Sequence, residues 1–438
     1  MKVAFIKVNM MYSKGKDALK PLVFSVIEEC TPEDVDIVFY DERIEKLPDK
    51  LDADVIAFSV ETFAAKHAYE LARKYKTDNN IIVMGGFHVS ACEEEALEHA
   101  DAIIVGDAEE TWPKLINDVK KSNLKRRYVS DNKCKISRIN PDGKCYRGKK
   151  YLKLGMVQAS RGCKFNCDFC SIKSLYPDGV RHKDIEDVVD EIKGIKEKLI
   201  FFIDDNLFYD EESACELFDA IKPLKKKWAC QISLEIAFRD ELLTKMKNAG
   251  CIMVLIGFES LNPDNLKLMK KSANLAVKHY EDAIQNIYKH KIMIYGMFVF
   301  GYDYDTASAI EETYKFASDN HFCIANFNPL MLLPGTELYE RYKAEKKTIH
   351  EKWWLDDNYH YGDAMHYPKS MTPKEMCDGC KSARYRFYAI RNVMKRLVKE
   401  KVNHATLFNI FVFLAINIIS GVEVHRKQGE KLGDSVKN

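Results

Sequence analysis

Residues 160–170 read SRGCKFNCDFC and place Cys163, Cys167 and Cys170 in the spacing C-x3-C-x2-C. An apolar strand, Leu154–Gln158, precedes them, so their loop is expected to begin at the carboxyl end of a strand. Soft thiolates select zinc or an iron–sulfur cluster. A structural zinc site needs a fourth ligand, and none of the eleven residues after Cys170 is Cys or His. The spacing therefore predicts a cluster on three cysteines with one iron left open; buried thiols, or zinc with a distant ligand, are the alternative.

Strands and helical patterns alternate through residues 151–340 around this motif. The expected strands are apolar runs separated by helical stretches, which is typical of parallel α/β units. They are Leu199–Ile203, Ala229–Ile236, Met253–Gly257, Ile292–Phe300 and Cys323–Pro329. We therefore expect a parallel α/β unit of barrel or partial-barrel size.

The cysteine motif and its place after the first strand resemble the radical S-adenosylmethionine (SAM) superfamily, in which Phe169 matches the aromatic residue before the last cysteine. The resemblance covers about residues 151–340 and implies a (β/α) partial TIM barrel. It also implies a [4Fe–4S] cluster whose open iron binds SAM. One-electron reduction then cleaves SAM to methionine and a 5′-deoxyadenosyl radical, which abstracts a hydrogen atom.

Residues at later strand ends match positions where this family contacts SAM. Asp204 and Asp205 form an acidic pair that suits the SAM ammonium group, with solvated loop carboxylates as the alternative. Glu259 is placed to accept hydrogen bonds from ribose hydroxyls. The other candidates are Phe169, Ser233 and Glu235 on the expected strand 229–236, Gly257, and the segments Val299–Gly301 and Leu333–Thr336.

Residues 1–125 also alternate short strands with helices, which predicts a Rossmann-like, doubly wound parallel sheet. The expected strands are Val3–Ile6, Asp36–Tyr40, Val55–Ser59, Ile81–Met84 and Ile103–Val105, and a helix is expected over Ala64–Tyr75. Two of the strands end in glycine, at Gly85-Gly86 and at Gly106. Ligands of open α/β sheets bind at such carboxyl ends, although many glycine turns are only turns.

This first region resembles the cobalamin-binding domain found before radical SAM barrels, through Gly85–His88, Glu93–Glu95 and Ala102–Thr111. The resemblance implies cobalamin as a cofactor, with Gly85, Gly86 and Gly106 as contacts. One departure is clear: the family's D-x-H-x-x-G signature is absent from Asn9–Gly15. Either cobalamin binds here without a histidine ligand or the domain has lost it.

Two further segments complete the chain. Residues 126–150 are polar and basic and are expected to form a linker, and residues 341–438 are expected to be mostly helical. Within the latter, residues 405–422 carry no charge. That length is at the short edge for a membrane span, so we expect a buried helix, with a helix on or in a membrane as the alternative. Cys377 and Cys380 are expected to be plain thiols, because two cysteines are too few for a closed metal site.

The amino-acid composition limits the kinds of binding partner and the cellular location to be expected. The 438 residues include 67 Lys and Arg against 66 Asp and Glu, which gives no global argument for a nucleic-acid partner. The 13 cysteines and the absence of a signal-peptide pattern favour a reducing cytoplasm.

The sequence thus predicts a radical SAM enzyme, with methylation of an unactivated carbon as the leading hypothesis. Radical cyclisation, rearrangement or other C–H functionalisation without cobalamin is the alternative, and a zinc-binding or membrane-linked binding protein is the alternative outside this class. A small or lipid-like substrate and a reducing donor such as flavodoxin or ferredoxin are the expected partners, with peripheral membrane association through residues 405–422.

Overall fold

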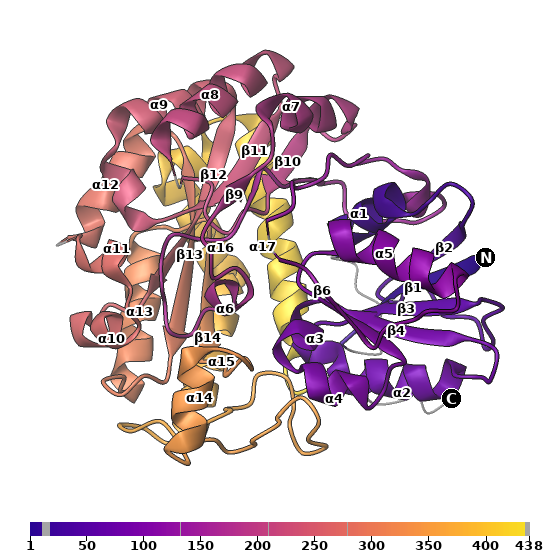
Figure 1. Ribbon diagram of the computed structural model, residues 1–438. Coiled ribbons are helices and arrows are strands. Elements are labelled where there is room, and N and C mark those ends of the chain that lie inside the picture. The colour runs from indigo at the N-terminus through magenta and orange to yellow at the C-terminus, as the bar shows by residue number, and fades with distance from the viewer. Residues whose placement is uncertain (11–17, 132, 209, 278, 434–438) are drawn as a thin grey trace.

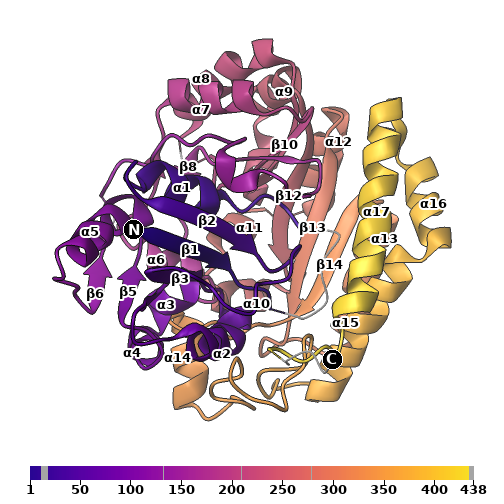
Figure 2. The ribbon, with the colours of Figure 1, turned by 90° about the vertical axis from the view of Figure 1, so that its right-hand side faces the viewer.

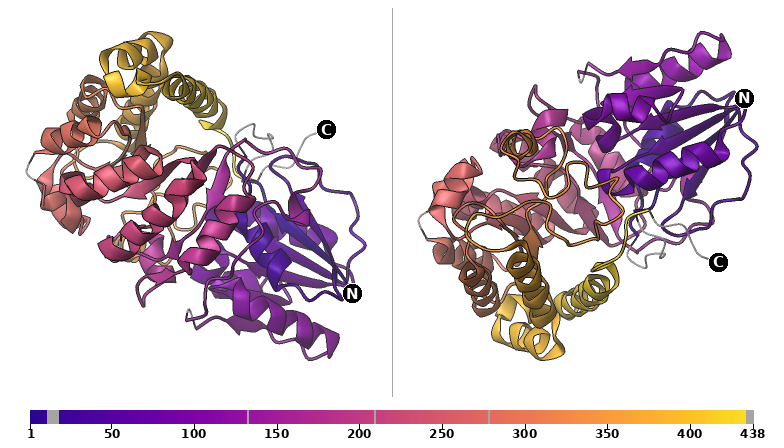
Figure 3. Two further views of the ribbon diagram at one scale, coloured as in Figure 1. Left: turned by 90° about the horizontal axis from the view of Figure 1, so that it is seen from above. Right: turned by 90° about the horizontal axis from the view of Figure 1, so that it is seen from below.

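The computed structural model describes residues 1–10, 18–131, 133–208, 210–277 and 279–433, and it contains two parallel sheets that lie side by side (Figures 1 and 3). The first sheet has the order β2-β1-β3-β4-β5-β6. Its strands are β1 Lys2–Lys7, β2 Asp36–Asp41, β3 Val55–Ser59, β4 Ile81–Gly85, β5 Ala102–Val105 and β6 Arg127–Val129. The five strands expected here are all present, and the Rossmann-like fold is confirmed.

Helices cover both faces of this sheet because side chains alternate along each strand. Val3 and Phe5 of β1 pack under α1 (Leu22–Cys30) and α5 (Ala108–Lys120). Ala4 and Ile6 face the opposite core. That core is covered by α2 Ala65–Tyr75, α3 Phe87–Ala91 and α4 Glu93–Leu97, with the 3-10 turn η1 Thr62–Ala64 before them.

The expected linker, residues 126–150, is partly built into the first sheet. Arg127–Val129 pairs in parallel with β5, and Tyr128 is its one buried side chain. Further on, Cys145 and Tyr146 of the turn η2 (Lys144–Tyr146) join the core beside α1, where the Tyr146 hydroxyl donates to the Pro21 carbonyl at 2.9 Å. This segment therefore fixes the start of the second sheet relative to the first.

The second sheet has six parallel strands in the order β14-β13-β12-β11-β10-β7, and its two edges do not pair, which confirms the partial barrel. Its strands are β7 Gly155–Val157, β10 Leu199–Phe202, β11 Lys227–Ile232, β12 Cys251–Glu259, β13 Met293–Phe300 and β14 Ile324–Pro329. Its larger helices are α7 Ile185–Gly194, α8 Glu211–Ile221, α9 Asp240–Ala249, α12 Tyr280–Lys289 and α13 Ala307–Asp319. The short elements are the hairpin β8 Ser160–Arg161 and β9 Arg181–His182, α6 Ser171–Leu175, η3 Lys222–Leu224, α10 Pro263–Leu268 and α11 Ser272–Leu275.

The strand expected over Ala229–Ile236 was wrong in its last part. The strand β11 ends at Ile232, and Leu234–Phe238 forms the 3-10 helix η4. The apolar pattern predicted a longer strand because Leu234 and Ile236 are buried in the same core as the strand residues. Ser233 and Glu235 therefore lie at the start of η4 and not on a strand.

The C-terminal region is largely helical, as expected, and packs against the second sheet. Its helices are α14 Glu337–Ala344, α15 Pro373–Tyr388, α16 Ile390–Lys399, η5 Lys401–His404 and α17 Leu407–Lys427. The helix α15 contacts α13 and β14, while α16 and α17 lie outside it (Figure 2). Cys380 is buried in that contact, and Cys377 packs against the same core.

Candidate functional site

The three cysteines of the motif lie in the loop between β8 and α6, above the carboxyl end of β7, and each is half-buried. Burial raises the pKa of the Cys167 thiol to about 11, against the smaller opposing effect of Lys271. Burial likewise raises the pKa of Cys170. Burial thus favours the neutral thiol of Cys167 and of Cys170 until a metal displaces the proton, which is the usual coupling of metal binding to ionisation.

The donor set consists of three thiols, and thiolates are the ligands of iron–sulfur clusters. Among the described residues, no three His, Cys, Asp or Glu side chains converge closely enough to hold one metal ion. In a [4Fe–4S] cluster each thiolate binds a different iron atom, so three cysteines would leave one iron open. Cys163, Cys167 and Cys170 are accordingly the residues that would hold the cluster.

Asp204 and Asp205, which follow β10, hold the base of this loop. The Asp204 carboxylate accepts the Ala159 backbone N–H at 3.1 Å and the Ser160 hydroxyl at 2.6 Å. Asp205 accepts the N–H of Gly162, the residue before Cys163, at 3.0 Å. Burial raises the pKa of Asp204 to about 6 and also raises that of Asp205. Both residues were predicted as SAM contacts. In the structure the two Asp204 oxygens and one Asp205 oxygen accept hydrogen bonds from the loop.

A second set of contacts holds the middle of the loop and was not predicted from the sequence. The buried carboxylate of Asp168 accepts hydrogen bonds from the Tyr302 hydroxyl at 2.7 Å and from Arg341 at 2.8 Å. The Asp168 N–H donates to the Met269 carbonyl, and its carbonyl accepts the Leu338 N–H. The loop is therefore fastened to the ends of α10, β13 and α14. These partners are far apart in the chain, so no local pattern indicates them.

Glu259, Lys271 and Phe169 form a compact group beside the cysteines. Lys271 Nζ lies 2.9 Å from Glu259 Oε1 and 5.9 Å from the centre of the Phe169 ring. Burial favours the neutral form of Lys271, but the charge and hydrogen bond of Glu259 oppose it and the pKa of Lys271 is raised. Gly257 makes room for the pair, since a Cβ there would lie 2.1 Å from Glu259 Oε1. Glu259 itself has a φ of 60°, a strained backbone held at the strand end.

Two buried polar groups beside the loop point to a ligand. Asn206 Nδ2, after β10, and Ser233 Oγ, after β11, have no hydrogen-bond partner among the described residues. Buried polar atoms normally have one. Glu235 is placed differently, because it faces Lys164 of the cysteine loop at 3.3 Å. A polar molecule such as SAM, seated at these strand ends, would satisfy Asn206 and Ser233. Asn206 was not predicted as a contact from the sequence.

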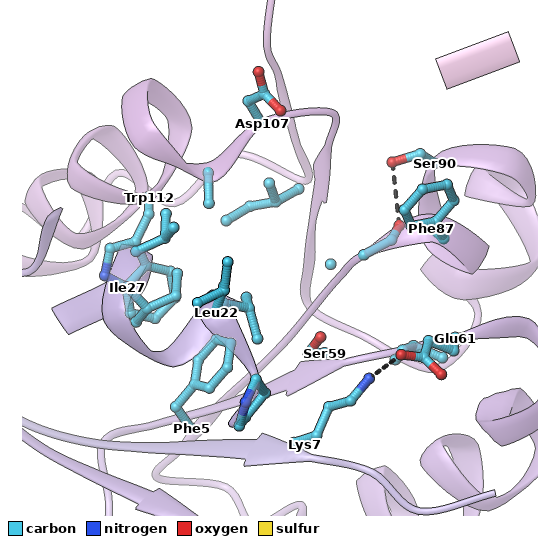
Figure 4. A pocket seen from close by; sticks show the side chains of 18 of the residues that line it. Phe5, Lys7, Leu22, Ile27, Ser59, Glu61, Phe87, Ser90, Asp107 and Trp112 are labelled. Atoms are coloured by element: carbon cyan, nitrogen blue, oxygen red, sulfur yellow. Dashed lines mark hydrogen bonds and ion pairs between the residues drawn. The ribbon is translucent and has the colours of Figure 1, made fainter. Parts of the chain in front are cut away.

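The first sheet carries a cavity of about 460 Å³ at the carboxyl ends of its strands (Figure 4). Phe5, Leu22, Ile27 and Trp112 line its apolar side, between the sheet and the helices α1 and α5. The predicted Gly85, Gly86 and Gly106 all line it.

Gly86 is a position in the cavity wall where a side chain would not fit. Its φ is 109°, and a Cβ there would lie 2.7 Å from the Val60 carbonyl oxygen. No histidine is among the described lining residues. The stretch Asn9–Gly15, where the cobalamin signature was sought, lies outside the described residues from position 11 on.

The cavity reaches the base of the cysteine loop through a buried charge network. Arg161, two residues before Cys163, lies 2.9 Å from Asp107 Oδ1 and 2.7 Å from Glu109 Oε1. Arg181 of β9 also pairs with Asp107. Because Asp107 and Arg161 both line the cavity, one wall belongs to the first sheet and the facing wall to the barrel. Whatever fills the cavity therefore lies next to the loop that would hold the cluster.

Comparison with known proteins agrees with this architecture. The family model described as the radical SAM superfamily matches residues 157–317, and the model described as the B12 binding domain matches residues 21–116. The chain is 29% identical to the bacteriochlorophyllide d C-12(1)-methyltransferase of Chlorobaculum tepidum over 92% of this chain and 90% of that protein. It is 26% identical to the hopanoid C-2 methylase of Rhodopseudomonas palustris over 76% of this chain and 66% of that protein.

A solved structure shares the fold. The radical SAM methyltransferase TsrM of Kitasatospora setae, with cobalamin and a [4Fe–4S] cluster bound, superposes with a TM-score of 0.59. The alignment has 14% identity and covers 78% of this chain and 75% of that one. The two-unit arrangement of sheets is thus one that occurs in solved proteins.

Proposed function

We propose that this chain, which is a radical SAM enzyme with an N-terminal B12-binding domain, methylates an unactivated carbon of a large, mainly apolar molecule. Its cofactors are a [4Fe–4S] cluster, SAM and cobalamin. When bound, the cluster supplies the electron that cleaves SAM, and cobalamin supplies the methyl carrier. The chain's own residues position these groups and exclude water.

The observation that supports this proposal most strongly is that the first sheet and the barrel line one cavity. Gly86 and Asp107 of the first sheet, and Gln158 and Arg161 of the barrel, line the same space. A cofactor held against the first sheet therefore faces the barrel opening, where the substrate must meet the adenosyl radical. The buried pair of Arg161 with Asp107 fixes this approach, because a paired buried charge is costly to separate.

The relatives support the substrate class. The two curated relatives compared above are named for methyl transfer to a bacteriochlorophyllide and to hopanoids, both multi-ring apolar molecules. Transfer of this property to the present chain is our proposal. We also propose a cytoplasmic location with membrane association through residues 405–422, and reduction of the cluster by a flavodoxin or ferredoxin. An uncharged helical segment in that range, of which only 22% is buried, supports the membrane association.

The test is anaerobic reconstitution with and without hydroxocobalamin, followed by measurement of iron, cobalt and 5′-deoxyadenosine. SAM with a deuterated methyl group is then supplied with candidate ring compounds, and products are analysed by mass spectrometry. We expect about one cobalt per chain and a product that is heavier by the labelled methyl group. A full cluster with deoxyadenosine, but no cobalt and no label transfer, would instead indicate cobalamin-free cyclisation or rearrangement.

A further inference from the structure

The helix α16 has a surface that no part of the proposed reaction explains. It reads IRNVMKRLVK and contains no acidic residue. Ile390, Met394 and Val398 recur every four residues and are exposed, Ile390 by 73% and Val398 by 67%. A cationic stripe, Arg391, Lys395 and Lys399, runs one position further along the same helix. This combination of an exposed apolar line and adjacent cations is typical of helices that lie in a membrane interface.

The helix α17 extends the apolar surface. Leu407, Phe411, Ile418 and Val422 are exposed, so these two helices carry seven of the fifteen large exposed apolar side chains among the described residues. The two helices contact each other and lie at the outer edge of the barrel (Figure 2). Patches of this kind on soluble proteins mark interaction sites.

Charge is concentrated in the same region. Residues 381–427 contain ten Lys and Arg against two Glu, whereas the whole chain is nearly balanced. Of the ten, Arg384 and Arg396 are buried and Arg386 pairs with Glu311. A groove of about 400 Å³ opens at the start of α17, lined by Phe411 and by the lysines 153, 196 and 198. Lys196 pairs with Asp142, and Glu197 also lines the groove. The described residues offer no acidic partner to Lys153 or Lys198, so the groove is a suitable place for a phosphate group.

A transmembrane arrangement does not fit the contacts of α17. By length and composition this helix could cross a membrane, but one side of it is fixed to the barrel. The Asn417 side chain donates to the Cys323 carbonyl at 3.1 Å and accepts from the buried Arg396 at 3.0 Å. Arg396 in turn donates to the carbonyls of Phe322 and Cys323. Pulling α17 into a bilayer would expose these polar groups to hydrocarbon, which is strongly unfavourable.

A second copy of the chain does not fit the charge. A two-fold contact would place the same surface on both sides, so Arg391, Lys395 and Lys399 would face their own copies. An anionic bilayer offers the opposite charge and also accepts the apolar stripe.

We infer that α16 and α17 together lie on an anionic phospholipid membrane, without crossing it, and that the lysine groove at the start of α17 takes a lipid phosphate. This inference rests on the membrane association proposed above and adds the helices, the orientation and the lipid class. A membrane-seated enzyme would meet apolar substrates where they are most concentrated.

The test is co-sedimentation of the reconstituted full chain with vesicles of phosphatidylcholine alone, or of phosphatidylcholine with about one third phosphatidylglycerol. We expect binding to the anionic vesicles that weakens as salt is raised, because salt screens exposed charges. The double variant Arg391→Gln with Lys399→Gln should bind about thirtyfold less, which corresponds to about 1 kcal/mol per basic residue near such a surface. The double variant Ile390→Ser with Val398→Ser should bind at least about tenfold less, because two apolar side chains are no longer removed from water.

Matched controls change the same residue types elsewhere. Val38→Ser with Val129→Ser removes two exposed valines of the first sheet, and Lys121→Gln with Lys289→Gln removes two lysines. These controls should bind like the parent chain. Absence of binding to anionic vesicles, or equal loss in test and control variants, would overturn the inference. So would concentration-dependent dimerisation that the α16 variants abolish while vesicle binding is absent.

The readout is independent of methyl transfer. Iron content and deoxyadenosine formation, measured in the same preparations without vesicles, should be unchanged in the α16 variants. Failure of the proposed function with intact vesicle binding is therefore distinguishable from failure of this inference.

Discussion

Both sheets have their candidate sites at the carboxyl ends of their parallel strands, but the two sites consist of different kinds of residue. The barrel uses three cysteines in a fixed spacing, held by Asp205 and Asp168. The first sheet uses glycines and apolar side chains around a cavity. A binding site can be predicted from the sequence when it depends on the types of its residues. It is much harder to predict when it depends on the shape of a cavity.

The largest expected effect is on the cysteine site. Cys163→Ala, Cys167→Ala and Cys170→Ala should each remove most cluster iron and all measurable SAM cleavage, because each removes one of the three thiolate ligands. Iron analysis and deoxyadenosine assays on the reconstituted proteins measure this. Cys377→Ala with Cys380→Ala is the control and should cleave SAM normally. Full cluster content in any of the three single variants would contradict the ligand assignment.

The second largest effect is expected at the buried ion pairs of Arg161, which connect the cavity of the first sheet to the cysteine loop. Arg161→Met removes the cation that lies 2.9 Å from Asp107 and 2.7 Å from Glu109, and leaves Arg181 as the cation beside Asp107. Breaking a buried pair typically costs about 3–5 kcal/mol. Thermal unfolding and bound cobalt should both fall. The control is Arg138→Met, whose pair with Asp190 is exposed and should be worth under about 1 kcal/mol. Equal losses of stability and of bound cobalt in the two variants would show that the Arg161 ion pairs do not couple the two sheets.

A smaller effect is expected at the cavity of the first sheet. Gly86→Ala places a Cβ against the Val60 carbonyl at a positive φ, and we expect a loss of about 3 kcal/mol in unfolding free energy, with weaker cobalamin binding. Gly148→Ala is the matched control, since its φ is 75° but nothing lies within 4 Å. It should cost about 1 kcal/mol, from the backbone alone. Urea unfolding and cobalamin titration separate the two.

The smallest effect is a pH dependence at the base of the loop. Burial raises the pKa of Asp204 to about 6, so the folded state holds its proton more tightly than the unfolded state does. The stabilisation is fully present below the unfolded pKa near 4 and is lost as the pH rises through 6. The whole effect is about 3 kcal/mol, of which about 2 kcal/mol falls between pH 4.5 and 7. In Asp204→Asn this component should vanish. Unfolding free energies of both proteins at pH 4.5 and 7 measure it, and an unchanged pH difference would contradict it.

Much of the fold could be predicted because buried strands are apolar runs that begin and end near polar or glycine residues. The edge strand β6 was missed, since Tyr128 is its only buried side chain and a three-residue strand leaves almost no pattern. The end of β11 was misjudged because η4 buries Leu234 and Ile236 as a strand would. Periodicity reports burial, and it does not by itself report backbone conformation.

The site was predictable only in part, for the same reason. The cysteines were identified by spacing, and the structure brings Phe169, Glu259 and Gly257 to their side as expected. Their contacts with SAM, like those of Ser233 and Glu235, stay predictions. Tyr302 and Arg341 hold the loop from 134 and 173 residues away, a distance over which a single sequence gives no signal.

The most direct test of the central claim is to ask whether the two sites hold neighbouring cofactors. In the reconstituted protein, the cobalt(II) EPR signal of bound cobalamin would be recorded with the [4Fe–4S] cluster oxidised and then reduced. The shared cavity predicts that the reduced, paramagnetic cluster broadens the cobalt signal and speeds its relaxation, and that Cys163→Ala abolishes the change. A cobalt signal that is indifferent to the state of the cluster would contradict the account.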